Sequence, residues 1–284
     1  MAKPHKFIFQ KNIDFNEDKH QYHVEGVRLS KFTISKIAGM ADPSGGLMRW
    51  ACKLAAESAM VGLPKDNEKL QTLSEPEMID YFSREADRQR DNAASLGTRI
   101  HACLEKHIIH RINDSSKVIR LHDLPILKKS DKDISAAVIS AQAYIDQEYE
   151  PVASEIRVVH PSGIPGTADF IGLSRSEFMP GYHLVDFKTV SDASFGRLYK
   201  KHFVQLAAYR YALESYSPTN KFSGCCIVQI HRETGDIKEF FLANTDEEHD
   251  LFMKLVEIAE YKKQKSIKSF AWGIGGQVLS DTND

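Results

Sequence analysis

Three ionisable side chains occupy two neighbouring apolar segments and are the first candidates for chemistry. Asp169 lies in one segment, and Asp186 and Lys188 lie in the next. Side chains two apart on a β-strand share a face, so Asp186 and Lys188 point the same way and Phe187 points to the opposite layer. Charged groups inside a sheet are costly unless they are paired or bind a metal. The pattern therefore indicates either a structural Asp–Lys pair or a divalent-metal site with a catalytic lysine.

The elements that must position these residues follow from the surrounding pattern. The two apolar segments flank turn-forming residues, which predicts a β-hairpin, and a strand at 155–160 leads into it. A helix at 193–216 and an apolar, β-branched strand at 222–229 follow. Strand, helix and strand in this order predict a right-handed crossover between parallel strands. A strand at 237–242 is expected to pair with 222–229 through a turn at 233–236.

The N-terminal third predicts a small hairpin and several helices. Residues 14–29 alternate apolar and polar side chains around polar turns, which is typical of a hairpin. Ser74 and Glu77 form a capping box that begins a helix reaching about residue 94, and Gly97 and Thr98 are expected to begin a separate helix. Further helices are predicted at 31–39, at 45–60, at 133–149 with Asp133 as N-cap, and from a capping box at 245–248 to about 263.

Composition restricts the class of protein. Of the 284 residues, 42% are apolar and 27% charged, as in an ordinary soluble globular protein, and no segment approaches the roughly 20 apolar residues of a membrane span. We therefore expect a cytoplasmic protein without a membrane partner, and an organellar location stays open. The net charge of −2 argues against coating nucleic acid by bulk electrostatics, but allows a local basic groove leading to an acidic metal site.

The four cysteines have neither CxxC spacing nor a secreted disulfide pattern. They are Cys52, Cys103, Cys225 and Cys226, and the adjacent pair lies in a strand-like apolar run. We expect all four to be buried free thiols.

Four motifs, taken together and in order, resemble those of a known family. They are GTRIHACLE at 97–105, GTADFIG at 166–172, DFKT at 186–189 and QLAAY at 205–209. The chain resembles the PD-(D/E)XK nuclease superfamily, and within it the RecB-like branch of phage-type and mitochondrial-maintenance exonucleases. The likeness is detailed over 97–230. It implies an α/β fold with a mixed sheet, in which a restriction-endonuclease-like αβββαβ core carries a mostly helical N-terminal elaboration.

The resemblance implies roles for the residues of the central hairpin. Asp169 and Asp186 would hold Mg²⁺ or Mn²⁺, with the backbone carbonyl of Phe187 as a further oxygen ligand. His101 would be the additional metal ligand used in this branch, and imidazole suits Mn²⁺ better than Mg²⁺. Lys188 would orient or deprotonate the attacking water and offset the charge that develops on the phosphorane.

Four further residues are implied in supporting roles. Gln205 and Tyr209, four apart on one helix face, would position the active site and the scissile strand. Glu105 and Glu155 would bind the metal through water or orient one of its ligands. Neither glutamate is distinguished from the other by its position in the sequence.

A basic segment precedes the QLAAY motif and is the candidate for phosphate contacts, with a solvated helix face as the alternative. The candidate DNA-contacting residues are Arg99, Arg197, Lys200, Lys201 and His202, of which the last four are expected on the same helix as Gln205.

Two absences distinguish the sequence from some members of the family that it resembles. No cysteine follows Cys226, so we expect no iron–sulfur cluster. The GxxxxGK phosphate loop is also absent, so we expect no nucleotide cofactor. We expect a single compact unit with an N-terminal elaboration at 1–96, a core at 97–265 with an insertion or lid at 111–132, and a flexible tail at 266–284.

The implied function is a divalent-metal-dependent DNA exonuclease of phage type, which hydrolyses phosphodiester bonds in recombination, repair or DNA degradation. Its expected partners are DNA with a free end and a single-strand annealing or recombination protein. Three alternatives stay open: a structure-specific or restriction-like endonuclease on the same core, a catalytically silent DNA-binding subunit, and a glycoside hydrolase. A glycoside hydrolase would need only the pair of carboxylates and would not explain Lys188.

Overall fold

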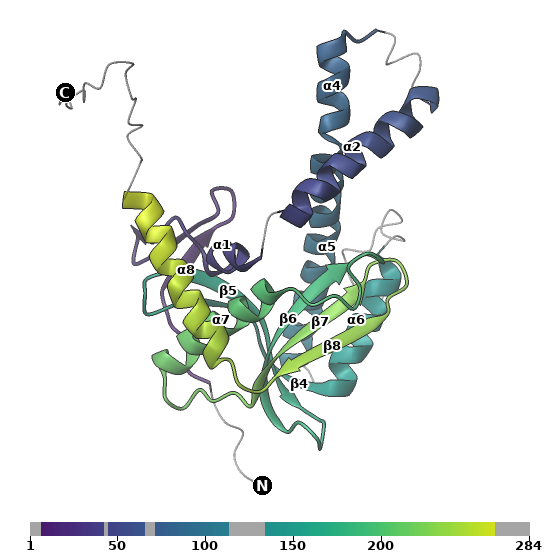
Figure 1. Ribbon diagram of the computed structural model, residues 1–284. Coiled ribbons are helices and arrows are strands. Elements are labelled where there is room, and N and C mark those ends of the chain that lie inside the picture. Colours follow the sequence, from purple (N-terminus) through teal and green to yellow (C-terminus); the bar gives the residue numbers. More distant parts are fainter. Residues whose placement is uncertain (1–6, 43–44, 66–71, 114–133, 265–284) are drawn as a thin grey trace, which may run out of the picture.

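A five-stranded mixed sheet lies at the centre of the computed structural model, which describes residues 7–42, 45–65, 72–113 and 134–264 (Figure 1). Its strands lie in the order β4 (Tyr149–Val159), β5 (Pro165–Ser174), β6 (Gly181–Val190), β7 (Gly224–His231) and β8 (Ile237–Leu242). The β4, β5 and β6 strands are antiparallel, β6 and β7 are parallel, and β7 and β8 are antiparallel. The predicted α/β fold, central hairpin and parallel crossover are thereby confirmed.

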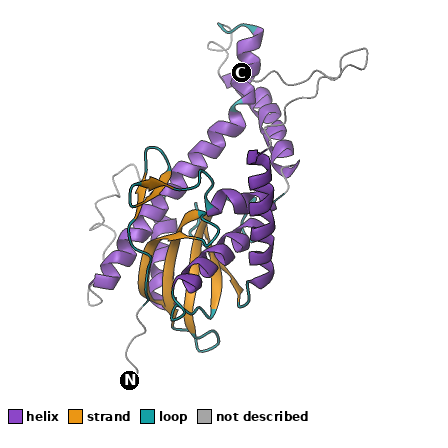
Figure 2. Ribbon diagram, turned by 90° about the vertical axis from the view of Figure 1, so that its left-hand side faces the viewer, coloured by secondary structure: helices purple, strands orange, loops and turns teal. Residues whose placement is uncertain are grey.

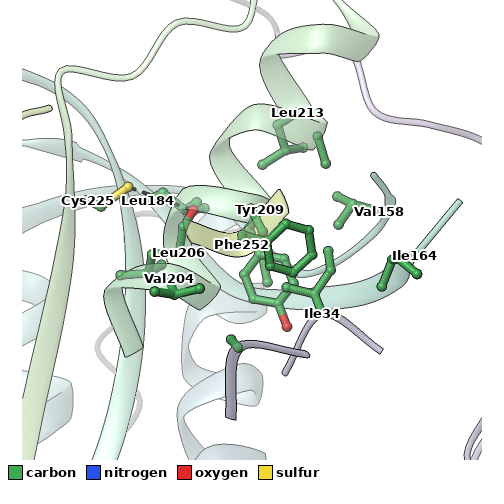
Figure 3. Packing of buried hydrophobic residues seen from close by; sticks show 14 of the residues in the cluster. Ile34, Val158, Ile164, Leu184, Val204, Leu206, Tyr209, Leu213, Cys225 and Phe252 are labelled. Atoms are coloured by element: carbon green, nitrogen blue, oxygen red, sulfur yellow. Dashed lines mark hydrogen bonds between the residues drawn. The ribbon is translucent and has the colours of Figure 1, made fainter. Parts of the chain in front are cut away.

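Helices cover both faces of this sheet (Figure 2). On one face lie α1 (Ile34–Ala38), α7 (Lys200–Tyr216) and α8 (Asp246–Gln264), which share a buried cluster with the strands. Figure 3 shows part of this cluster, including Leu206, Tyr209 and Phe252. On the other face, α5 (Glu85–Asn113) and α6 (Ser135–Glu148) form a second cluster.

Strand β7 explains why the sheet is covered on both sides. All eight of its residues are buried, and the first five, at 224–228, form an apolar run instead of an alternating pattern. A strand that pairs on both edges and packs on both faces has this composition. The α6 helix contributes the expected stripe of Ile134, Val138 and Ile145 to the second cluster.

The N-terminal region forms a small sheet and a group of helices. The predicted hairpin is confirmed as β1 (Ile13–Asn16) and β2 (Gln21–Val24), to which a short β3 (Val27–Arg28) adds. The η1 turn (Gly39–Ala41), α2 (Gly45–Lys65) and α4 (Glu75–Ser83) follow. The Ser74–Glu77 capping box is confirmed, with the Ser74 N–H donating to the Glu77 carboxylate at 2.7 Å. Figure 1 shows α2, α4 and the start of α5 extending away from the main sheet.

The expected start of a helix at Gly97 and Thr98 is wrong. Helix α5 runs without interruption from Glu85 to Asn113, and the break lies instead at Arg84. The Thr98 hydroxyl donates to the Ala94 carbonyl at 2.9 Å, so it bonds back along a continuing helix and does not cap a new one. The proposed division between residues 96 and 97 therefore falls inside a helix.

The expected helix at 193–216 begins seven residues too early. Residues 193–196 form turns, residues 197–199 are irregular, and Gly196 has a φ of 77°, which a helix does not accommodate. Gln229 holds this loop, because its side chain accepts from the Gly196 N–H at 2.8 Å and donates to the Arg197 carbonyl at 2.7 Å. Gln229, on the buried strand β7, thus forms hydrogen bonds with two backbone groups that would be bonded within a helix if this segment were helical.

Strand β4 is longer than the expected 155–160. It begins at Tyr149 and includes Pro151, beside which the register shifts. Proline is tolerated here because β4 is an edge strand and lacks a partner on one side.

Some expectations concern residues outside the described ones, namely most of the insertion at 111–132, the Asp133 cap and the tail at 266–284. All four cysteines are free, and three are buried, but Cys52 is exposed, so its expected burial is wrong. Among the described helices, none combines the length and the apolar character that crossing a membrane requires.

Candidate metal-dependent active site

Strands β5 and β6 separate where their two aspartates face each other. Phe170 pairs with Val185, and the next positions toward this end of the sheet are Asp169 and Asp186. The regular pairing stops there, and the Asp169 Oδ2 atom accepts the Phe187 N–H at 3.0 Å. A carboxylate thus takes the place of a backbone carbonyl as the acceptor. Both aspartates therefore lie at the same end of this strand pair, close enough for the charge of Asp169 to act on Asp186.

Asp186 is held between a lysine and a glutamine. The Lys188 Nζ atom lies 2.6 Å from Asp186 Oδ2, and the Gln205 amide donates to Asp186 Oδ1 at 3.3 Å. Asp186 is 1% exposed, whereas Phe187 packs in the cluster on the other face of the sheet. The predicted shared face of Asp186 and Lys188 is therefore confirmed.

Burial and charge act in opposite directions on this pair. Burial raises the pKa of the Asp186 carboxyl, the Lys188 ammonium opposes that effect, and the charge of Asp169 adds to it. Burial lowers the pKa of Lys188, but the charges of Asp186 and Asp169 outweigh it and raise this pKa above its ordinary value. Lys188 is therefore an ammonium at neutral pH, which donates hydrogen bonds and offsets negative charge.

His101, Glu155 and Asp169 offer three ligand atoms that lie within 4.8 Å of one another. Helix α5 supplies His101, whose Nδ1 atom is 3.6 Å from Asp169 Oδ2. Glu155 lies on β4 opposite Asp169, between Ser154 and Ile156. Two carboxylates and an imidazole fit a divalent cation such as Mn²⁺ or Mg²⁺. Asp186 lies outside this group of three and is engaged by Lys188.

Glu155 has an unusual backbone and an unusual charge environment. Its φ is 49°, in the left-handed region that a residue with a long side chain adopts at a cost of about 1 kcal/mol. Burial of its carboxyl group, followed by the charges of Asp169 and Glu105, raises its pKa to about 7. The residue as a whole is nevertheless exposed. Strain and electrostatic repulsion at one residue are typical of a functional position.

Tyr209 and Glu105 complete the surroundings. The Tyr209 hydroxyl accepts from the Gln205 amide at 3.3 Å, and burial followed by the charges of Asp169 and Asp186 raises its pKa, so the phenol stays neutral. Its ring packs against Gly166, where a Cβ atom would lie 2.5 Å from Tyr209 Cε1. Glu105 is one turn beyond His101 on α5 and acts here through its charge. Its predicted role as a ligand or ligand-orienting group stays a prediction, as does that of the Phe187 carbonyl.

Two cavities open at these residues. One has a volume of about 560 Å³, and its wall includes His101, Glu155, Asp169, Gln205 and Tyr209. The second, of about 370 Å³, is lined by Lys188, Lys201 and His202. The two cavities share Ser35 and Gln205, so the cavity that contains Glu155 and Asp169 adjoins the one that contains Lys188.

The candidate DNA-contacting residues are distributed differently from the prediction. Arg197 lies in the loop before α7, so its expected place on the helix of Gln205 is wrong. Lys200 is exposed on the first turn of α7, and Lys201 forms a 3.4 Å ion pair with Asp42. Arg99 is half-buried on α5. For these basic residues, contact with DNA stays a prediction.

His202 differs from its basic neighbours in charge. Burial and then the Lys188 ammonium lower its pKa to about 4, which makes it neutral at pH 7. A neutral imidazole cannot offer the ionic phosphate contact that its position in the basic segment suggested.

The sequence reasoning missed one wall of the larger cavity. Phe15, His20 and Tyr22 of the N-terminal hairpin line it, as do Thr33, Ser35 and Lys36 at the start of α1. The alternation at 14–29 predicts the hairpin, but its docking beside residue 167 is a contact across some 145 positions that no local pattern reveals.

Comparison with known proteins agrees with this geometry. Residues 73–268 match the family described as the PD-(D/E)XK nuclease superfamily, which is more than half of the chain. The chain therefore belongs to the PD-(D/E)XK nuclease superfamily, and the five-stranded mixed sheet with its helices is consistent with the restriction-endonuclease-like fold of that superfamily.

No curated protein matches the sequence. Among solved structures, one titled "Crystal structure of SSO0001" is similar at 16% identity and a TM-score of 0.30, and the match covers 57% of this chain and 72% of that one.

Proposed function

We propose that this protein is a metal-dependent DNA exonuclease. Membership of the superfamily implies a nuclease that uses a divalent metal. The observation that carries the proposal of metal-dependent hydrolysis is the meeting of Asp169 and Asp186 where β5 and β6 separate, with the Lys188 ammonium 2.6 Å from Asp186. The preference for a free DNA end rests on the resemblance of the four motifs to those of RecB-like exonucleases. A glycoside hydrolase would have no use for that lysine.

The residues of the site have distinct proposed roles. His101, Glu155 and Asp169 would hold Mg²⁺ or Mn²⁺. Asp186 would become a further ligand when one of its carboxylate oxygens binds the ion. The bound ion would polarise the phosphate and lower the pKa of water. The Lys188 ammonium would donate a hydrogen bond to the attacking water and offset charge on the phosphoryl oxygens.

Gln205 and Tyr209 are positioning residues in this scheme. The Gln205 amide donates to both Asp186 and Tyr209, so it fixes the orientation of the Asp186 carboxylate. The neutral phenol of Tyr209 and its packing on Gly166 hold Gln205 in place. Loss of either side chain would leave the acids present but misaligned, which lowers catalysis more than metal binding.

The substrate we propose is DNA with a free end, in recombination, repair or DNA degradation. The deciding experiment incubates the protein with closed circular, nicked and linear plasmid in Mg²⁺ or Mn²⁺. An exonuclease degrades only the linear molecule, and with a suitable end preference the nicked one. Linearisation of the closed circle would show an endonuclease instead.

Lys188→Ala is the control in that experiment. It should fold, bind metal and lose hydrolysis, because the ammonium is removed and the carboxylates and His101 remain. Degradation at the wild-type rate by Lys188→Ala, or activity that survives EDTA in wild type, would overturn the assignment of the catalytic site.

A further inference from the structure

Three aromatic rings of the N-terminal hairpin form one wall of the larger active-site cavity. They belong to Phe15, His20 and Tyr22. The centroid of the Phe15 ring lies 4.5 Å from that of Tyr22 and 5.5 Å from that of His20, at interplanar angles of 39° and 46°. Because the rings are tilted and not stacked flat, they form a concave corner. We call Phe15, His20 and Tyr22 the aromatic corner.

The aromatic corner is fixed relative to the acids of the site. The Tyr22 hydroxyl is hydrogen-bonded to the Thr167 hydroxyl at 2.9 Å, two residues before Asp169 on β5. The Arg157 guanidinium donates to the Ile13 carbonyl at 3.2 Å, two residues after Glu155 on β4. The hairpin is therefore tied to both strands that supply carboxylates, and its rings hold their place beside the ion site.

The chemistry of the cavity changes from one side to the other. The aromatic corner presents ring surface to the cavity. Within it, Tyr22 is buried and His20 is exposed. The adjoining cavity presents Lys188 and Lys201. Aromatic rings bind nucleobases by stacking on their faces, and lysines bind phosphates. The arrangement suits a nucleotide whose base contacts the aromatic corner and whose phosphate lies near the carboxylates and the lysines.

The state of that base follows from the geometry. A base within a duplex has both faces covered by its neighbours, so it cannot stack on a protein ring until it is unpaired and turned out. The cavity volume of about 560 Å³ lies in the usual range for small-molecule sites, about 300–1,000 Å³, and therefore suits a single nucleotide.

We propose that the aromatic corner stacks the unpaired base next to the scissile phosphate, with Phe15 and His20 as specificity-determining residues. The active site then acts on single-stranded or frayed DNA and requires a base at this position. The inference rests on the proposed nuclease function and assigns the strand state of its substrate.

The test places a single abasic nucleotide at successive positions near each end of a single-stranded oligonucleotide. At one position the missing base should lower kcat/KM by about 5- to 100-fold, the range expected for one aromatic–base stack. Phe15→Ala should cause a similar loss on the intact strand. It should cause no further loss on the strand that lacks this base, because the stacking partner is already absent.

Two substitutions separate stacking from folding. Phe15→Leu keeps apolar volume and removes the ring, so it should lose activity like Phe15→Ala, whereas Phe15→Tyr should retain it. Val27→Ala is the matched control, because Val27 lies on neighbouring β3, is 69% exposed and does not line the cavity. An equal effect of abasic scanning at every position, or full activity of Phe15→Leu, would overturn the proposal.

A binding measurement distinguishes failure of this inference from failure of the nuclease assignment. A strand carrying 2-aminopurine at the critical position should change fluorescence on binding in Ca²⁺, and Phe15→Ala should abolish that change. A protein that cleaves DNA but shows no position-dependent signal would refute the aromatic corner alone. A protein with the signal but without cleavage would refute the nuclease function alone.

Discussion

Helix α5 carries two histidines that each lie beside an aspartate, and the two environments are opposite in character. His107 Nε2 is 3.1 Å from Asp146 Oδ1, and Arg111 Nε is 2.9 Å from the same oxygen. His107 is 1% exposed. His101, two turns earlier, is beside Asp169 and opens onto the large cavity.

The comparison shows how a structural polar cluster differs from a functional one. At Asp146 one acid faces a permanent cation and a buried imidazole, so charge is balanced within the protein. At Asp169 the neighbouring acids Glu155 and Asp186 add negative charge that the single Lys188 does not offset. Excess acid at an open cavity, with strained backbone at Glu155, favours binding of a ligand of opposite charge.

The largest expected difference is in activity. Lys188→Ala should lower kcat on linear DNA by about 10²- to 10⁴-fold, because the group that offsets charge in the transition state is lost. Arg111→Ala, which removes a cation from the structural cluster, should leave the rate per folded molecule within about twofold. Initial rates at saturating Mn²⁺ measure both, and a comparable loss in both variants would erase the distinction.

Stability should show the reverse order. Asp146→Asn should lower the free energy of unfolding by about 1.5–3 kcal/mol, because the charged acceptor of Arg111 and His107 is lost. Asp169→Asn should leave the metal-free protein equally or more stable, since it relieves repulsion and keeps an acceptor for the Phe187 N–H. Urea unfolding in EDTA compares the two variants. Greater destabilisation by Asp169→Asn would contradict the account.

The packing beneath the site offers a smaller effect. Gly166→Ala should lower stability by about 1–3 kcal/mol and reduce activity, because its Cβ would lie 2.5 Å from Tyr209 Cε1 and 3.2 Å from Ile34. Gly97→Ala is the matched control for stability. No atom lies within 4 Å of its added Cβ in the middle of α5, so we expect a gain of about 0.5–1 kcal/mol.

The two clusters should respond to pH with opposite signs in the metal-free protein. The pKa of Glu155 is raised from 4.5 to about 7. Its contribution to the free energy of unfolding is therefore fully present below pH 4.5 and is lost as pH rises through 7. Burial lowers the pKa of His107 below 6.5. Its contribution to the free energy of unfolding is therefore fully present above pH 6.5 and is lost as pH falls through the lowered pKa. Glu155→Gln should remove only the first slope and His107→Gln only the second, as thermal unfolding across this range would show.

Local sequence patterns predicted the central strands and much of the candidate site. The alternation that puts Asp186 and Lys188 on one face, and the apolar run of β7, depend on period and composition alone. The four motifs then placed His101, Asp169 and Gln205 near one another, and the structure brings them to one cavity.

Several features that the sequence does not reveal depend on contacts between distant residues. Gln229 holds the turn at Gly196 from 33 positions away, so the helix begins later than periodicity suggests. The backbone strain at Glu155 arises where β4 faces Asp169 across the sheet. The docking of the hairpin through Tyr22 depends on the folded position of Thr167.

The central claim is that the separating ends of β5 and β6 gather carboxylates around a divalent cation. Mn²⁺ binding, followed by electron paramagnetic resonance on the metal-free protein, tests it most directly. Wild type and Lys188→Ala should both bind Mn²⁺, and Asp169→Asn should weaken binding by at least about tenfold. Wild-type affinity in Asp169→Asn, or no binding in wild type, would contradict the account.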